Sequence, residues 1–156
     1  MSSTTDRHPP GPWAGHARRA LQDAGLRRGG AREAVIDFLT AQDCATRAQE
    51  IHAALRAAGP RVSLASVYRA LETLHGLGLV QRLEVGQGEA LYEAALPSGE
   101  HHHHVVCERC ERILPFEDRA LEQAIARLAR RVDFQVDAHE VVLHGRCPSC
   151  READAH

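Results

Sequence analysis

Long hydrophobic runs are missing from this sequence of 156 residues, and no apolar segment approaches the roughly 20 residues that a membrane-spanning helix needs. Lysine is also absent, so all 19 basic residues are arginines, and aromatic residues make up only 4% of the chain. The apolar content of 44% is ordinary for a globular protein, which predicts one or two small domains.

A secretory signal is missing as well. The start of the chain, MSSTTDRHPPGPW, is polar and proline-rich and has no apolar segment behind it. Residues 1–12 are therefore expected to form a disordered tail and not a signal peptide. The cytoplasm is the expected location, and clustered cysteines in that compartment indicate metal binding more than disulfides.

Two catalytic zinc motifs are lacking. No HExxH occurs, and a zinc deaminase needs His-x-Glu followed by Pro-Cys-x-x-Cys. Here His139 and Glu140 are adjacent, and Pro148 lies inside its cysteine pair instead of before it. A zinc hydrolase or deaminase is therefore disfavoured, and the protein is not expected to be an enzyme.

Four of the five cysteines form two CxxC pairs, Cys107 with Cys110 and Cys147 with Cys150, separated by 36 residues. A two-residue gap lets both sulfurs of a pair reach one ion, so four soft ligands are available for a tetrahedral zinc. The alternatives are two unrelated reduced pairs or a disulfide, although disulfide frameworks are typical of short secreted chains. The spacing predicts a structural zinc site, because four thiolates leave no open position for catalysis.

Four consecutive histidines, residues 101–104, stand just before the first cysteine pair. In a β-strand, alternate side chains point to opposite faces, so His102 and His104 would face one way and His101 and His103 the other. One strand could therefore supply two metal sites. A solvated histidine-rich loop is the alternative, but Val105-Val106 directly after the run resembles the buried continuation of a strand.

Charge is distributed unevenly along the chain. Residues 1–92 carry 11 arginines against 9 acidic residues, a net charge of +2, whereas residues 93–156 carry 8 arginines against 12, a net charge of −4. Five arginines near the start of the chain surround a single acid, Asp23: Arg18, Arg19, Arg27, Arg28 and Arg32. The charges alone fit a nucleic-acid contact surface and a solvated helix face equally well.

The first half of the chain has the pattern of a winged helix. Helical spacing predicts four helices, over 13–24, 31–41, 46–58 with Thr46 as N-cap, and 63–75 with Ser63 as N-cap. Two β-type runs, 79–85 and 89–92, follow and are joined by Gly86-Gln87-Gly88 as a hairpin. In a winged helix the last helix enters the major groove, so residues 13–93 are predicted to bind DNA.

The second half predicts a small α/β domain over residues 101–150, after a linker at 94–100. It contains the histidine strand, a helix at about 117–131, and strands at 134–136 and 140–143. Residues 151–156 are expected to be a polar tail. The predicted fold class is therefore α+β, with two domains.

The order of these parts resembles the ferric uptake regulator family of metal-dependent repressors, over about residues 17–150. The residues that carry the resemblance are Gly25-Leu26-Arg27 with Arg32, SLASVYRAL at 63–71, Gly78-Leu79-Val80, HHHHVVCERC at 101–110, Glu122, His139, and Gly145 before CPSC. The resemblance implies an N-terminal winged-helix DNA-binding domain and a C-terminal dimerisation domain. It also implies a homodimer that binds a palindromic DNA operator when metal is loaded, without a membrane or a small-molecule substrate.

The resemblance also implies a role for particular residues. The DNA contacts would be Arg27 and, on the recognition helix, Ser66, Tyr68 and Arg69. The structural zinc ligands would be Cys107, Cys110, Cys147 and Cys150, and a further site would contain His101, His103, Glu122 and His139. The regulatory site, which would bridge the linker, would contain Glu93, His102 and His104, and its divalent metal is expected to be zinc, with ferrous iron or manganese as alternatives.

Three departures from the family pattern favour zinc. Cys44 lies near the position where many members have a sensing histidine, and it is either a substitute ligand or an inert buried cysteine. Pro115 replaces a carboxylate of iron and peroxide sensors, with Glu117 and Asp118 following it. His103 stands where iron sensors often have aspartate, and imidazole suits zinc well. We therefore expect a zinc uptake regulator, with an iron- or peroxide-responsive member as the alternative.

A zinc-stabilised interaction module without metal sensing is a further alternative. Such a module would explain the four cysteines, but it would leave the histidine run, Glu122 and His139 without a role.

Overall fold

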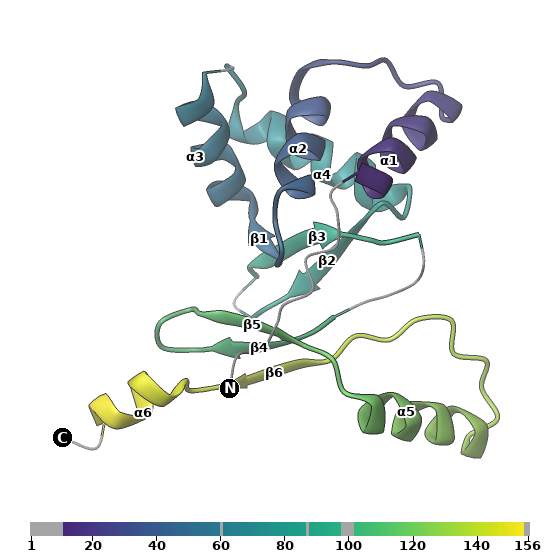
Figure 1. Ribbon diagram of the computed structural model, residues 1–156, viewed down its shortest axis with the longest axis vertical. Helices are drawn as coiled ribbons and strands as arrows, with labels where there is room; N and C mark the ends of the chain where they lie inside the picture. Colours follow the sequence, from purple (N-terminus) through teal and green to yellow (C-terminus); the bar gives the residue numbers. More distant parts are fainter. Residues whose placement is uncertain (1–10, 60, 87, 98–101, 155–156) are drawn as a thin grey trace. The chain divides into compact units, whose positions relative to one another are not determined.

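The computed structural model describes residues 11–59, 61–86, 88–97 and 102–154 (Figure 1). The chain divides into two compact units, Met1–Glu100 and His101–His156. The division falls at the end of the predicted linker, residues 94–100. His101, which is one of the four consecutive histidines, lies outside the described residues.

The first unit contains four helices: α1 (Gly11–Asp23), α2 (Gly30–Thr40), α3 (Ala48–Ala58) and α4 (Leu64–Gly76). The predicted cap of α4 is present, because Ser63 Oγ accepts a hydrogen bond from the Ser66 N–H at 3.1 Å. The helix α1 begins at Gly11, so the last two residues of the predicted tail, 11 and 12, are helical. The remainder of that tail lies outside the described residues.

A three-stranded antiparallel sheet completes the first unit. It consists of β1 (Thr46–Arg47), β2 (Val80–Glu84) and β3 (Ala90–Ala94), in the order β1-β3-β2. The predicted N-cap role of Thr46 is wrong, because Thr46 pairs with Tyr92 in the sheet and α3 begins at Ala48. The Glu50 carboxylate accepts the Arg47 N–H instead, at 3.1 Å. Figure 1 shows the four helices gathered on one side of this sheet.

The hydrophobic core of the first unit fixes α4 against the sheet. Val67, Leu71 and Leu74 on the inner face of α4 are fully buried, and Leu79 just beyond the helix is 1% exposed. Each such side chain contributes about 1.5–3 kcal/mol through burial. Trp13 Nε1 donates a hydrogen bond to the Leu79 carbonyl at 2.9 Å, which attaches α1 to the start of the β2–β3 hairpin. The outer face of α4 is therefore held in a defined orientation.

The second unit consists of β4 (His103–Cys107), β5 (Ile113–Phe116), α5 (Arg119–Arg131), β6 (Val142–Gly145) and α6 (Pro148–Asp154). Its sheet has the order β5-β4-β6, with β4 antiparallel to β5 and parallel to β6. Asp118 caps α5, since its Oδ1 accepts the Leu121 N–H at 2.8 Å, so this helix begins two residues later than predicted. Figure 1 shows α5 and α6 beyond the two ends of this sheet.

The structure differs from three expectations for the second unit. Residues 134–136 form no strand, because within the described part of the unit this short segment pairs with no other strand. Phe134 is 74% exposed. The strand predicted at 140–143 lies instead at Val142–Gly145. Residues 151–154 of the predicted tail are helical, because Asp154 forms ion pairs with Arg109 and Arg146.

Within the described residues, the helices are all too short or too polar to cross a membrane.

Candidate metal centres and nucleic-acid interface

The four cysteines of the CxxC pairs converge in the second unit. Their sulfur atoms all lie within 4.8 Å of one another, and Cys110 Sγ is 3.7 Å from Cys147 Sγ. The parallel pairing of β4 with β6 explains this, because it places Cys107 opposite Gly145, two residues before the second pair. All four are free thiols and not disulfides. The arrangement matches the donor set of a closed tetrahedral zinc site.

Electrostatics within this cluster favour a cation. Hydrogen bonds from the backbone N–H groups of Cys110, Cys147 and Arg109 lower the pKa of Cys107 to about 6. The hydrogen bond with Cys147, followed by burial and the other sulfurs, raises the pKa of Cys150 to about 12. Without a cation the cluster therefore favours one thiolate and disfavours a further one at Cys150. A divalent ion would offset part of the charge of four thiolates and so favour their deprotonation.

A second donor cluster includes a residue of the same strand, His103 at the start of β4. His103 Nε2 is 2.5 Å from Glu122 Oε1, and His139 Nε2 is 3.0 Å from Glu122 Oε2. His103 is 1% exposed, and its ring packs 5.5 Å from the ring of Phe116. The three ligand atoms lie within 4.8 Å of one another, so they suit a metal that accepts nitrogen and oxygen ligands. His101, the fourth predicted ligand, lies outside the described residues.

The regulatory residues are divided between the two units. His104 is buried, and because it follows His103 in β4 its side chain points to the opposite face of the strand. His102 precedes the strand, and its Nε2 lies 3.1 Å from Glu117 Oε1. Glu93 belongs to β3 of the first unit. A site containing these three predicted ligands therefore remains a prediction.

Cys44 lies in the same neighbourhood of the first unit as Glu93. It is exposed as a residue, but burial of its thiol raises its pKa, and the charges of Asp43, Glu93 and Glu50 raise it further. A thiol in this environment stays protonated at neutral pH unless a cation replaces the proton. The alternative of a fully buried cysteine does not hold, because the residue is exposed although its thiol is partly desolvated.

The predicted DNA contacts on α4 have distinct environments. Arg69 is exposed, and its Nη2 donates a hydrogen bond to Ser66 Oγ at 3.1 Å. Tyr68 is half-buried at the edge of the core, where its hydroxyl accepts a hydrogen bond from Gln49 Nε2 at 3.1 Å. Ser66 Oγ also contacts Ser63 Oγ at 2.9 Å. Of these three residues, Arg69 is therefore the most accessible to DNA.

The basic cluster near the start of the chain has two kinds of members. Arg18 is paired with Glu33 and, at 2.6 Å, with Asp37, and the hydrogen bond with Glu33 raises its pKa. Arg27 is exposed in the segment between α1 and α2, where its carbonyl accepts a hydrogen bond from Arg32 at 3.2 Å. Arg27 is therefore the better candidate for a contact with a phosphate.

Sequence reasoning missed a group of polar residues beside Tyr68. Arg47, Gln49 and Arg82 line a cavity in the first unit together with Tyr68 and Tyr92. Their positions along the chain gave no signal, because the short strand β1 and the β2–β3 hairpin bring them together only through pairing with β3.

Comparisons with known proteins agree on one family. Residues 23–144 match the model of the ferric uptake regulator family. A ferric uptake regulation protein of Legionella pneumophila is 36% identical over 132 residues, which cover 84% of this chain and 96% of the relative. A peroxide-responsive repressor PerR of Staphylococcus saprophyticus is 31% identical over 134 residues, with 85% and 88% covered.

The fold agrees with the same family. The crystal structure of the Vibrio cholerae ferric uptake regulator has a TM-score of 0.75 and 30% identity, and the match covers 83% of this chain and 98% of that one. The predicted α+β class is thus confirmed, whereas the names of these relatives do not specifically support the predicted zinc branch. Family members are transcriptional regulators and not enzymes. This chain, with its winged-helix unit and its converging cysteines, belongs to the ferric uptake regulator family.

Proposed function

We propose that the protein is a zinc-responsive transcriptional repressor that acts in the cytoplasm, binds a palindromic DNA operator as a homodimer, and controls zinc uptake. The observation that carries the proposal is that β4 contributes a ligand to each of two separate donor clusters, His103 at its start and Cys107 at its end. The cysteine cluster suits a permanent structural ion, and the His103 cluster suits a further ion. A single-purpose zinc-stabilised module would need only the cysteines.

The four cysteines would hold the permanent zinc. When bound, zinc supplies a dication that neutralises thiolates and ties β4 to β6. Cys107 is prepared for this role by the N–H groups around it, which favour its thiolate. Because such a site is not preformed in an unfolded chain, its binding free energy adds to the folding free energy of the second unit.

A second copy of the chain would cover the apolar side chains that the second unit exposes. The helix α5 has no buried residue, and Leu128 is 48% exposed although it lies at core spacing. The other exposed large apolar side chains of this unit are Leu114, Val132, Phe134, Val136 and Leu143. Exposed apolar surface of this kind marks interaction sites, and the family relationship indicates that the partner is an identical chain.

The regulatory ion would be held by Glu93, His102 and His104, with ligands from both sides of the linker. Such an ion binds one arrangement of the two units better than others, and thereby favours the arrangement that binds DNA. Zinc is supported by the imidazole-rich ligands and by Pro115, which cannot supply the carboxylate of iron sensors. The cluster of His103, Glu122 and His139, with His101, would hold a further ion.

An iron- or peroxide-responsive regulator is the second candidate function. It is favoured by the names of the relatives, which are a ferric uptake regulation protein and a peroxide-responsive repressor. The ligand types do not exclude iron, because imidazole and carboxylate also bind ferrous iron.

Operator recognition would use the outer face of α4. Arg69 would read a guanine edge or bind a phosphate, and the Tyr68 ring would contact a thymine methyl group. Ser66 would support Arg69, and Arg27 would contact the backbone or the minor groove.

A titration tests the choice of metal. Protein from which all metal except the zinc at the four cysteines has been removed is titrated with buffered zinc, ferrous iron or manganese. Binding to a palindrome of the family type is measured by gel shift. We expect zinc to restore binding and His102→Ala with His104→Ala to abolish the response while the protein stays folded. Restoration by ferrous iron and not by buffered zinc would establish the second candidate instead.

A further inference from the structure

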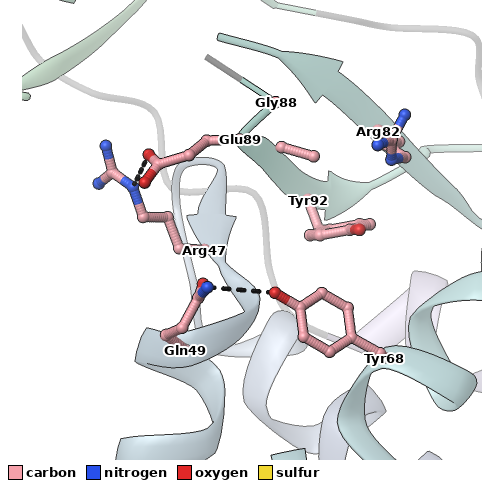
Figure 2. A pocket seen from close by; sticks show the side chains of 8 residues that line it. Arg47, Gln49, Tyr68, Arg82, Gly88, Glu89 and Tyr92 are labelled. Atoms are coloured by element: carbon pink, nitrogen blue, oxygen red, sulfur yellow. Dashed lines mark hydrogen bonds and ion pairs between the residues drawn. The ribbon is translucent and has the colours of Figure 1, made fainter. Parts of the chain in front are cut away.

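A polar cavity of about 110 Å³ lies in the first unit, where the start of α3, the recognition helix α4 and the β2–β3 hairpin meet (Figure 2). Nearly all of its functional groups are hydrogen-bond donors. They are the guanidinium groups of Arg47 and Arg82, the amide of Gln49 and the hydroxyls of Tyr68 and Tyr92. Such a set of donors suits an anion.

The cavity already contains an anionic group of the chain itself. Glu89, at the tip of the hairpin, accepts a hydrogen bond from Arg47 Nε at 3.1 Å. The Arg47 side chain is only 15% exposed and is also 3.7 Å from Glu50, whereas the Glu89 side chain is 52% exposed. The Glu89 carboxylate thus contacts a largely buried Arg47 from the solvent side. Glu89 can move away from Arg47 without disturbing the core.

The other side of the cavity presents a second cation. Arg82 extends from β2, and in Figure 2 it lies across the Tyr92 ring from Arg47. The hydrogen bond between Arg82 and Tyr92 raises the pKa of its guanidinium, and Glu84 is its ion-pair partner. An anion between the two arginines would meet positive charge from both walls.

Tyr68 connects this cavity to the DNA-reading helix. Its hydroxyl accepts a hydrogen bond from Gln49 Nε2 at 3.1 Å, so its own proton remains available to donate to an acceptor (Figure 2). The neighbouring residue, Arg69, is the exposed base-reading candidate. A ligand bound in the cavity would therefore lie one residue from the proposed base contact.

We propose that this cavity binds a phosphate of the operator backbone, and that Glu89 occupies the place of that phosphate while DNA is absent. The proposal rests on the proposed function, because it requires α4 and the hairpin to lie against DNA. Arg47 exchanges a carboxylate for a phosphate on binding, and a guanidinium fork suits both groups. Glu89 is thus a competitor built into the chain that weakens DNA binding.

The test measures operator affinity of the metal-loaded full-length protein in a double-mutant cycle of Arg47→Gln and Glu89→Gln. We expect Glu89→Gln to tighten binding roughly fivefold, since a partly exposed ion pair opposes binding at each of two cavities in a dimer. We expect no such gain when Arg47→Gln is already present. Glu72→Gln is the control for general electrostatics, because Glu72 is an exposed acid on α4 that does not line the cavity. Any gain from Glu72→Gln should be the same with and without Arg47.

The remaining outcomes overturn the proposal. A similar gain for Glu89→Gln with and without Arg47 would mean that any lost acid favours DNA. A Glu72→Gln gain that also disappears with Arg47→Gln would mean that the coupling is not specific to Glu89. Weaker binding by Glu89→Gln would mean that the ion pair only braces the hairpin. Arg47→Met, which keeps the apolar stem and removes the charge, replaces Arg47→Gln if the latter melts early, and the same loss of the Glu89 effect is expected.

The proposed function fails in a different way. If the wild-type protein binds no operator with any metal, both the function and this phosphate site are wrong. If the wild-type protein binds in a metal-dependent way and Glu89→Gln brings no gain, only the phosphate site is wrong.

Discussion

Glu122 Oε2 lies 3.0 Å from His139 Nε2, although Glu122 is on α5 and His139 belongs to a segment without regular structure. The other oxygen of the same carboxylate faces His103 on β4. One carboxylate therefore unites three parts of the second unit. We predict that Glu122→Ala lowers the number of zinc ions bound per chain by one, because the loss of even an outer-shell partner weakens a metal site about 10- to 100-fold.

Equilibrium dialysis with elemental analysis measures this stoichiometry. The matched control is Glu152→Gln on α6, which should bind as many ions as the wild type. An unchanged ion count in Glu122→Ala would remove this cluster from the metal sites.

The Cys107 thiol gives the metal-free protein a pH dependence. Its pKa is lowered from an ordinary 9.0 to about 6 in the folded unit, so between these values the unfolded chain binds more protons than the folded one. We predict that the stability of the reduced, metal-free protein rises from pH 6 to pH 9, and that this contribution is lost as the pH falls through about 6. Urea midpoints across this range measure the effect.

Cys107→Ser should flatten that rise, whereas Cys44→Ser should leave it in place. Cys150 should make stability fall as the pH rises above 9. Its pKa is raised to about 12 in the folded unit, so in this range the folded protein binds more protons than the unfolded chain. A rise that persists in Cys107→Ser would assign the pH dependence to other groups.

Phe134 offers a test of the dimer that does not depend on the core. Its side chain is 74% exposed in the single chain, so Phe134→Asp should change folding little. We predict that it weakens dimerisation at least tenfold, because a charge would be buried in an apolar interface. Sedimentation velocity measures the oligomeric state, and Leu77→Asp, an exposed apolar residue of the first unit, serves as the control. If the Phe134→Asp variant dimerises with the same affinity as the wild type, the interface lies elsewhere.

Arg69 and Arg27 should affect DNA binding differently. We predict that Arg69→Ala costs about 1–3 kcal/mol of operator binding and relaxes sequence preference, as expected of a base-reading arginine. Arg27→Ala should weaken all sequences alike and make binding less salt-dependent. Fluorescence anisotropy with operator and scrambled DNA at several salt concentrations separates the two patterns. Equal losses on both DNAs for Arg69→Ala would make it a backbone contact.

Local patterns predicted the elements that local forces stabilise. The helix α4 begins where Ser63 caps it, and its apolar spacing put Val67 and Leu74 in the core. The short strand β1 was missed because two residues form a strand only through pairing with β3, more than 40 positions away. The helix α6 was missed because Asp154 is held by ion pairs with Arg109 and Arg146, which no periodicity reveals.

The candidate sites divide in the same way. The CxxC spacing alone indicated that the pairs of Cys107 and Cys147 form one site. Each pair supplies two ligands that are close in sequence, and a tetrahedral zinc needs four. Glu122 and His139 came from the family resemblance, because a carboxylate on a helix carries no sign of a distant histidine. The cavity around Arg47 had neither a local pattern nor a resemblance to reveal it.

The strand β4 has a consequence for how this protein can vary. His103 and Cys107 lie at its two ends, and both its neighbours fix its register, with His103 opposite Phe116 and Cys107 opposite Gly145. Deleting or inserting one residue within it would turn His103 and His104 to each other's faces and pull Cys107 away from its three fellow sulfurs. Such a frame-preserving change would disable every ion site of the second unit in one event. Metal preference in this lineage can therefore change through substitution of single side chains. It cannot change through insertion or deletion of a residue in this strand, because the metal sites would be lost.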